Sequence, residues 1–290
     1  MSNVAFIKDI PVARFDVEQD SQLKTSYDSK YKTGWFLMKG LPRPSFTPRL
    51  MKEIKDYFDT VKREMFQTKG EQYDYLVLAS DVKGVFNLGG DLDLFGQYIQ
   101  RNDRVGLLAY AMQSIDLVYQ NMTHLDADLT TISLIQGDAL GGGFEAAISS
   151  NVIVAERGTK MGLPEVLFNL FPGMGAYSLL SRKIGYAATE KLILSGRLYL
   201  AEELHDMGVV DILAEVGEGE VAVYQYIKSA NRAKNTHGAM RKLRGICNQV
   251  SYDELKDIGA VWADAALQLR PKDLRMMERL VRRQNTRVEN

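Results

Sequence analysis

Residues 137–145 read Gly-Asp-Ala-Leu-Gly-Gly-Gly-Phe-Glu, a glycine-rich run that ends in a glutamate. It follows a strand-like run at residues 131–135 and precedes a helix that we expect to begin near Phe144. A glycine-rich turn at this point leaves backbone N–H groups unpaired, and the helix dipole makes them better donors. Glycine also lets a ligand approach the backbone closely. The stretch therefore predicts an α/β chain with a candidate ligand site at a helix N-terminus.

A second turn of the same kind occupies residues 87–92, Asn-Leu-Gly-Gly-Asp-Leu, ahead of a helix predicted from about Asp93 through Arg101. Together, two such turns would form an oxyanion hole, in which one donor is worth roughly 3–4 kcal/mol in a transition state. Either turn taken alone also fits a purely structural role in helix–strand packing. Neither turn has the spacing of a dinucleotide fingerprint or of a phosphate-binding loop.

Two glutamates lie next to these turns and are the candidate catalytic residues. Glu145 closes the first stretch, and Glu165 ends the run Gly-Leu-Pro-Glu at residues 162–165. One strand-like stretch, residues 151–155, separates them and would return the chain to the same pocket. Carboxylates that share a pocket shift each other's pKa and can divide acid and base work. Each glutamate alone has a plainer explanation, as a helix N-terminal charge or an exposed surface residue.

Composition favours an ordinary soluble protein of a reducing compartment, and we expect a cytoplasmic one. The chain has 290 residues, 46% of them hydrophobic, with a net charge of −1 and a pI near 6.4. That balance gives no global attraction to nucleic acid or to anionic membranes. The single cysteine, Cys247, excludes an internal disulfide, and no apolar run approaches the length of a membrane span. His124, His205 and His237 share no metal-ligand spacing, so we expect no metal site.

Strand and helix alternate up to about residue 215, and helix alone follows. We therefore predict an N-terminal arm at residues 1–30, a catalytic core at 31–215 and a helical region at 216–290. Ser45 or Thr47 is expected to cap the first long helix. The strands are predicted at residues 34–38, 73–80, 131–135, 151–155 and 209–213, and the helices before the C-terminal region at 48–67, 93–101, 104–125, 176–184 and 188–194.

In combination, these motifs resemble the crotonase, or enoyl-CoA hydratase/isomerase, superfamily. The matching stretches are residues 87–92, 137–145, 163–165, 171–176 and 195–210. The resemblance implies an α/β fold built as a spiral of ββα units, with a helical C-terminal region that builds homotrimers; pairing of trimers into hexamers stays open. It also implies that Gly90 and Gly142 supply the oxyanion N–H groups, and that Glu145 and Glu165 are the acid and base.

Both ends of the chain look like those of the diffusible-signal-factor synthases of Gram-negative bacteria. The similar segments are residues 31–36, 43–48 and 261–263. That resemblance implies dehydration of a 3-hydroxyacyl-acyl-carrier-protein and hydrolysis of its thioester, which releases a cis-2-unsaturated fatty acid signal. It implies no cofactor, and it implies acyl carrier protein and a signal-sensor protein as partners. The alternative within enzymes is a CoA-dependent enoyl hydratase or isomerase of fatty acid metabolism.

The predicted substrate site also includes Gly89 and Gly141, with Met174, Trp262 and Leu280 as candidates for the lining of an acyl pocket. Large apolar residues at helical spacing equally suit a core or a subunit interface. A different class of function is a non-catalytic module that binds RNA or a protein partner. Its best support is the basic segment at residues 270–287. Acidic residues interrupt that segment, so a solvated helix face or a docking surface for acyl carrier protein fits it as well.

Overall fold

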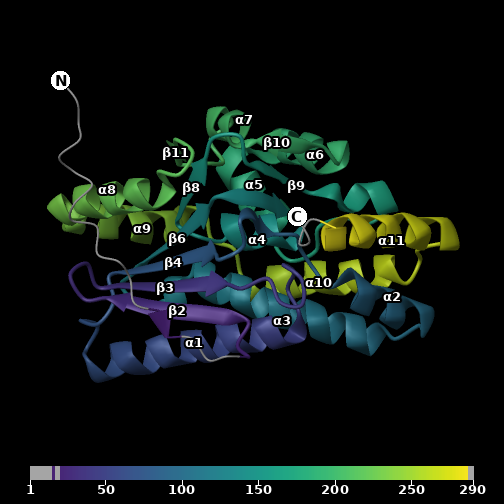
Figure 1. The fold of residues 1–290 in the computed structure, drawn as a ribbon, viewed down its shortest axis with the longest axis horizontal. Helices are drawn as coiled ribbons and strands as arrows, with labels where there is room; N and C mark the ends of the chain where they lie inside the picture. The colour runs from purple at the N-terminus through teal and green to yellow at the C-terminus, as the bar shows by residue number, and fades with distance from the viewer. Residues whose placement is uncertain (1–14, 17–19, 287–290) are drawn as a thin grey trace.

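The larger of two β-sheets forms the centre of the molecule. A computed structural model describes residues 15–16 and 20–286 (Figure 1). Within them the larger sheet has the order β1-β2-β3-β4-β6-β8-β11. Strands β3 to β11 pair in parallel, whereas β1, β2 and β3 pair antiparallel. The strands are β1 (Phe15–Asp16), β2 (Leu23–Asp28), β3 (Thr33–Met38), β4 (Tyr75–Ser80), β6 (Thr130–Ile135), β8 (Val152–Glu156) and β11 (Ile212–Ala214).

The smaller sheet runs beside it in the order β10-β9-β7-β5. Its strands are β5 (Gly84–Asn87), β7 (Gly137–Leu140), β9 (Lys160–Gly162) and β10 (Leu198–Leu200). Each of β4, β6 and β8 in the large sheet is followed directly in sequence by β5, β7 or β9 in the small sheet, and then by a helical segment. This repeat confirms the predicted spiral of ββα units, and the chain from residue 219 onward confirms the helical C-terminal region.

Helices cover both faces of the large sheet. The faces are packed by two clusters of buried side chains, one with α1 and α3 and the other with α8. Figure 1 shows α8 and α9 at the opposite end of the molecule from α2 and α11. The helices are α1 (Pro48–Gln67), α2 (Leu92–Gln100), α3 (Arg104–Met122), η2 (His124–Asp126), α4 (Gly142–Ile148), η3 (Pro164–Phe168), α5 (Ala176–Ile184), α6 (Tyr186–Ser195), α7 (Ala201–Asp206), α8 (Gly219–Arg232), α9 (Lys234–Cys247), α10 (Tyr252–Ala266) and α11 (Pro271–Thr286).

Two predictions about the strands were wrong in detail. The chain between Glu145 and Glu165 contains two strands, β8 and β9, where one was predicted. The second was not predicted because β9 has only three residues, too few to show an alternating pattern. The strand predicted at residues 209–213 lies at Ile212–Ala214, since the backbone N–H groups of Val209 and Val210 bond to Leu204 at the end of α7. The division into arm, core and helical region stays a prediction. Residues 1–14 and 17–19 of that arm lie outside the described residues.

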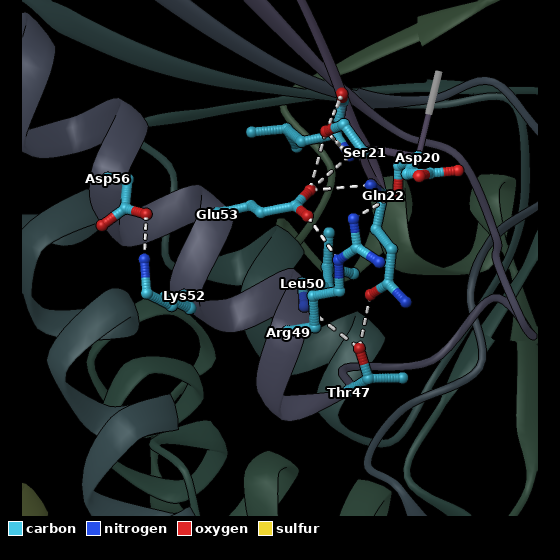
Figure 2. Close-up of polar contacts among 10 residues, drawn as sticks. Asp20, Ser21, Gln22, Thr47, Arg49, Leu50, Lys52, Glu53 and Asp56 are labelled. Atoms are coloured by element: carbon cyan, nitrogen blue, oxygen red, sulfur yellow. Dashed lines mark hydrogen bonds and ion pairs between the residues drawn. The ribbon is translucent and has the colours of Figure 1, made fainter. Parts of the chain in front are cut away.

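A polar cluster holds the first turns of α1 in place (Figure 2). Helix α1 also contributes residues to the wall of the candidate site. Glu53 accepts hydrogen bonds from the Ser21 hydroxyl and from the backbone N–H groups of Gln22 and Leu23, at 2.7–3.0 Å. Thr47 caps the helix by accepting from the Leu50 N–H at 3.0 Å, which confirms one of the two predicted caps. The cluster ties the start of β2 to α1, and Glu53 is the acceptor of the Gln22 N–H.

Candidate active site

The two glycine turns meet at the N-terminal ends of α2 and α4. Gly90 forms a parallel bridge with Phe46, and the Phe46 N–H donates to the carbonyl of Gly89 at 2.8 Å. A Cβ atom added to Gly142 would lie only 3.4 Å from the backbone nitrogen of Gly90. The first N–H groups of α4 have no partner within their own helix. The turns therefore present backbone donors to the same small space.

Side chains from distant segments hold the Gly90 turn in place. The Tyr110 hydroxyl donates to the Phe46 carbonyl and accepts from the Asp91 N–H at 3.2 Å. Arg43 pairs with both Asp91 and Asp93, at the start of α2. The sequence alone did not predict that Tyr110 and Arg43 would support this turn. The helical spacing of Tyr110 on α3 was the available signal, but it could not show which turn the residue would reach.

Glu145 lies in the first turn of α4, with a relative exposure of 2%. Its Oε1 atom accepts from the N–H groups of Met174, at 2.8 Å, and Ala176, at 3.1 Å. Burial raises the pKa of Glu145 because it disfavours the charged form, while the two N–H donors act in the opposite direction. The donors also fix the position of the carboxyl group relative to the glycine turns.

Glu165 lies in η3 and has fewer partners. Its Oε1 atom would be 2.6 Å from a Cβ atom added to Gly141, so the carboxyl group packs directly against that glycine turn. Among the described residues, its buried Oε2 atom has no hydrogen-bond partner. Burial raises the pKa of Glu165, and the charge of Glu145 raises it further. Because the two carboxylates repel each other, the pair favours a state in which one of the two carboxyl groups is protonated.

A cavity of about 410 Å³ opens in front of both glutamates. Trp262 of α10 lies against its wall, where a Cβ atom on Gly173 would be 2.3 Å from the indole. The Trp262 ring also meets Phe95 edge-on, with the centroids 5.1 Å apart. The structure brings every predicted site residue to this one cavity: Gly89, Gly90, Gly141, Gly142, Glu145, Glu165, Met174, Trp262 and Leu280. Their catalytic and binding roles stay predictions.

Other candidate chemistries find less support. In the part of the chain that the structure describes, no group of three or more His, Cys, Asp or Glu side chains could hold a metal ion. None of the described helices has the length and apolar character needed to cross a bilayer. The basic segment at residues 270–287 is largely α11, and Arg287 lies outside the described residues.

The family model for enoyl-CoA hydratase/isomerase matches residues 38–243. This chain belongs to the enoyl-CoA hydratase/isomerase family. The matched range contains both glycine turns and both glutamates, so the family and the geometry point to the same part of the chain. Trp262 and Leu280 lie beyond the match, in helices that return to the cavity.

Individual relatives agree with the family. The chain is 28% identical to the fatty acid oxidation complex subunit alpha of Pseudomonas aeruginosa, over 76% of this chain and 30% of the relative. It is 26% identical to the mitochondrial methylglutaconyl-CoA hydratase of Rattus norvegicus, over 71% of this chain and 63% of the relative. The chain thus spans less than a third of that alpha subunit. The solved structure of Pseudomonas aeruginosa DspI shares the fold, with a TM-score of 0.63 at 19% identity, over 84% of this chain and 93% of that one.

Proposed function

We propose that this chain interconverts 3-hydroxyacyl and 2-enoyl thioesters by removing or adding water. The observation that carries the proposal is the pair of buried carboxyl groups, Glu145 and Glu165, in one cavity beside two facing glycine turns. A thioester carbonyl placed at the turns would receive the N–H groups of Gly90 and Gly142. These donors would stabilise the negative charge that develops on the carbonyl oxygen when C2 gains or loses a proton.

The surroundings of the two glutamates suggest their roles. Glu145 receives two backbone N–H donors, so negative charge is more stable on Glu145, and Glu165 is the protonated member of the pair. In hydration, Glu145 takes a proton from water as the water oxygen bonds to C3. Glu165 then gives its proton to C2. Dehydration is the reverse, in which C2 loses its proton to Glu165 and the C3 hydroxyl leaves as water with a proton from Glu145.

A second candidate is hydrolysis of the thioester, as in synthesis of a cis-2-unsaturated fatty acid signal. One observation favours a protein-borne substrate over CoA. No basic side chain is among the described residues that line the cavity, and Arg43, beside the Gly90 turn, is already paired with Asp91 and Asp93. The phosphates of CoA would gain little there. We therefore propose acyl carrier protein as the carrier; a homotrimer and a signal-sensor partner are proposed on the resemblance alone.

In that second reaction a water oxygen bonds to the carbonyl carbon while a glutamate takes the water proton. The carbon–sulfur bond then breaks, and the carrier thiol leaves with a proton. The Gly90 and Gly142 N–H groups would hold the tetrahedral oxyanion in this step. The same site can serve both reactions because both place negative charge on the same oxygen.

Turnover of matched substrates tests both candidates. The purified protein is given 3-hydroxydecanoyl groups on acyl carrier protein and on CoA, and mass spectrometry follows enoyl thioester and free acid. Enoyl product that disappears with Glu165→Gln supports the first proposal. Free acid released from the carrier-protein substrate, with little from CoA, supports the second. The first proposal would be contradicted if neither the carrier-protein nor the CoA substrate were interconverted. It would also be contradicted if Glu145→Gln and Glu165→Gln both kept the wild-type rate.

A further inference from the structure

The lining of the cavity includes one face each of α1, α3 and α4, and we call the space between these three faces the lobe. The residues that line it repeat at intervals of three, four or seven, which places them on one face of each helix. From α4 and its C-cap these are Gly142, Glu145, Ala146 and Ser149; from α3, Tyr110, Ser114, Leu117, Val118 and Asn121; and from α1, Met51, Ile54 and Phe58. Tyr110 and Gly142 lie at the glycine turns, so the faces of α3 and α4 lead away from the proposed carbonyl site.

The far end of this lobe is polar. The Asn121 side-chain N–H group donates to the hydroxyls of Ser149, at 2.8 Å, and Ser150, at 3.0 Å. These bonds join the ends of α3 and α4. Asn121 is 4% exposed and Ser149 is 3% exposed, although both line the cavity. The lobe is therefore closed by a buried amide–hydroxyl pair, whereas its walls are mostly apolar.

One atom of this closed end lacks a partner. Among the described residues, the buried Oδ1 atom of Asn121 has no hydrogen-bond donor. Buried acceptors are nearly always satisfied, and an unsatisfied one requires an explanation. An alkyl end pressed against this oxygen would keep it unpaired. A group that brings an O–H would satisfy it.

The length of the lobe limits the chain that it can hold. From Gly142 to Ser149 the axis of α4 advances by roughly 10 Å. An extended carbon chain advances by roughly 1.3 Å for each carbon, given ordinary bond lengths and tetrahedral angles. A chain of about eight to ten carbons, starting from a carbonyl at the glycine turns, would therefore reach Asn121 and Ser149.

We propose that Asn121 and Ser149 form a distal subsite that sets the length of the acyl chain and binds an O–H group. That O–H group is either a hydroxyl at the far end of the chain or a water molecule that caps a plain alkyl end. The substrates are then medium-chain acyl thioesters. Met174 and Trp262 enclose the part of the chain beside the glutamates. The inference rests on the proposed function, because it places the thioester carbonyl at Gly90 and Gly142.

Binding of free fatty acids tests the subsite without requiring turnover. Saturated acids of six to sixteen carbons, and their ω-hydroxy counterparts, are titrated by calorimetry against the wild type. The same titrations use Asn121→Ala, Asn121→Leu and, as a matched control, Ser150→Ala. The control loses one bond to Asn121, but Ser150 is not among the residues that line the cavity.

For the wild type we expect affinity to rise roughly tenfold for every two carbons and then to fall once the chain meets the closed end. Asn121→Ala should move that fall to longer chains, by about two carbons, and Asn121→Leu should move it to shorter ones. Ser150→Ala should leave it in place. Tighter binding of the ω-hydroxy acid, lost in Asn121→Leu, identifies a chain hydroxyl as the donor, whereas equal binding of the two series identifies water.

The proposal is overturned if folded Asn121→Ala and Asn121→Leu keep the wild-type length profile, or if the wild type shows no length limit. Circular dichroism and thermal unfolding establish that the variants are folded. A parallel series of 3-hydroxyacyl thioesters separates this result from the proposed function. A length limit in binding without any turnover would contradict the proposed function and support the distal subsite. Turnover without a length limit would support the proposed function and contradict the distal subsite.

Discussion

Glu53 and Glu165 are both carboxylates packed against the protein interior, yet the structure surrounds them in opposite ways. Glu53 accepts from the Ser21 hydroxyl, two backbone N–H groups and the Arg49 guanidinium (Figure 2). The Oε2 atom of Glu165 has no partner among the described residues, and its neighbour in charge is Glu145. The first arrangement surrounds the carboxylate with donors, whereas in the second, burial and the charge of Glu145 raise the pKa of Glu165.

This difference separates a structural carboxylate from a reactive one. A carboxylate whose oxygens are both hydrogen-bonded, such as that of Glu53, holds two segments together. A carboxylate with a free oxygen and a raised pKa can exchange a proton with a substrate. Breaking each arrangement should therefore change different quantities, namely folding stability at Glu53 and turnover at Glu165.

The largest effect is expected on the rate. Glu165→Gln and Glu145→Gln should each lower kcat for interconversion of 3-hydroxyacyl and 2-enoyl thioesters by about 10²–10⁴-fold, since each removes one proton carrier. Glu53→Gln should keep kcat within a factor of about three, because Glu53 is not among the residues that line the cavity. Steady-state kinetics on the three variants checks this. A similar loss of kcat in all three variants would mean that the substitutions lower the rate by disturbing the fold and not by removing a catalytic group.

Gly141 provides a sharper test of the geometry around Glu165. Its backbone has φ +53°, and an added Cβ atom would lie 2.6 Å from Glu165 Oε1. Gly141→Ala should cost about 1–3 kcal/mol of stability from backbone strain and should lower kcat by roughly 10²-fold, because Glu165 must move. Gly217→Ala is the control, since Gly217 also has a positive φ, +81°, but nothing lies within 4 Å. Equal kcat values in Gly141→Ala and Gly217→Ala would show that the contact between residue 141 and Glu165 does not affect turnover.

Glu53 should show its effect in unfolding. Glu53→Ala leaves the Gln22 N–H without its acceptor and removes the acceptor that joins the Ser21 hydroxyl and the Leu23 N–H to α1. This change predicts a loss of about 1–3 kcal/mol in the free energy of unfolding. The neighbouring Lys52 forms only an exposed i,i+4 pair with Asp56, at 2.6 Å, so Lys52→Ala should change that free energy by less than about 0.5 kcal/mol. Chemical denaturation of both variants measures the contrast. Similar midpoints would show that the cluster in Figure 2 adds little.

The parts of the site that depend on local sequence could be predicted, and the parts that depend on distant contacts could not. Glycine turns before helices and the cap at Thr47 are local patterns, so they were found. The donors that Glu145 receives come from backbone groups of Met174 and Ala176, about 30 residues away, and a backbone N–H carries no mark in the sequence. The same holds for Asn121, whose partner Ser149 is 28 residues away on another helix.

The smallest expected effect is that of Glu165→Gln on the free energy of unfolding. This substitution should increase the stability, whereas substitution of Glu53 should decrease it. Burial and the charge of Glu145 raise the pKa of Glu165 above its value in the unfolded chain, so ionising this group destabilises the folded protein as the pH rises. The raised pKa of Glu165 contributes most to folding stability below about pH 4.5, where the carboxyl group is protonated in both the folded and the unfolded protein. This contribution to stability is lost as the pH rises through the pKa of Glu165 in the folded protein. Glu165→Gln cannot ionise, so its stability relative to wild type should increase with pH.

We therefore expect Glu165→Gln to gain stability of the order of 1 kcal/mol over the wild type between about pH 5 and pH 9, while it loses activity. Thermal unfolding across that range measures the trend, and Glu53→Gln, which should lose stability across the range, is the matched control. A difference that stays constant with pH would show that Glu165 is ionised at little cost. Glu165 would then not be the protonated member of the pair, and the roles proposed for the two glutamates would have to be exchanged.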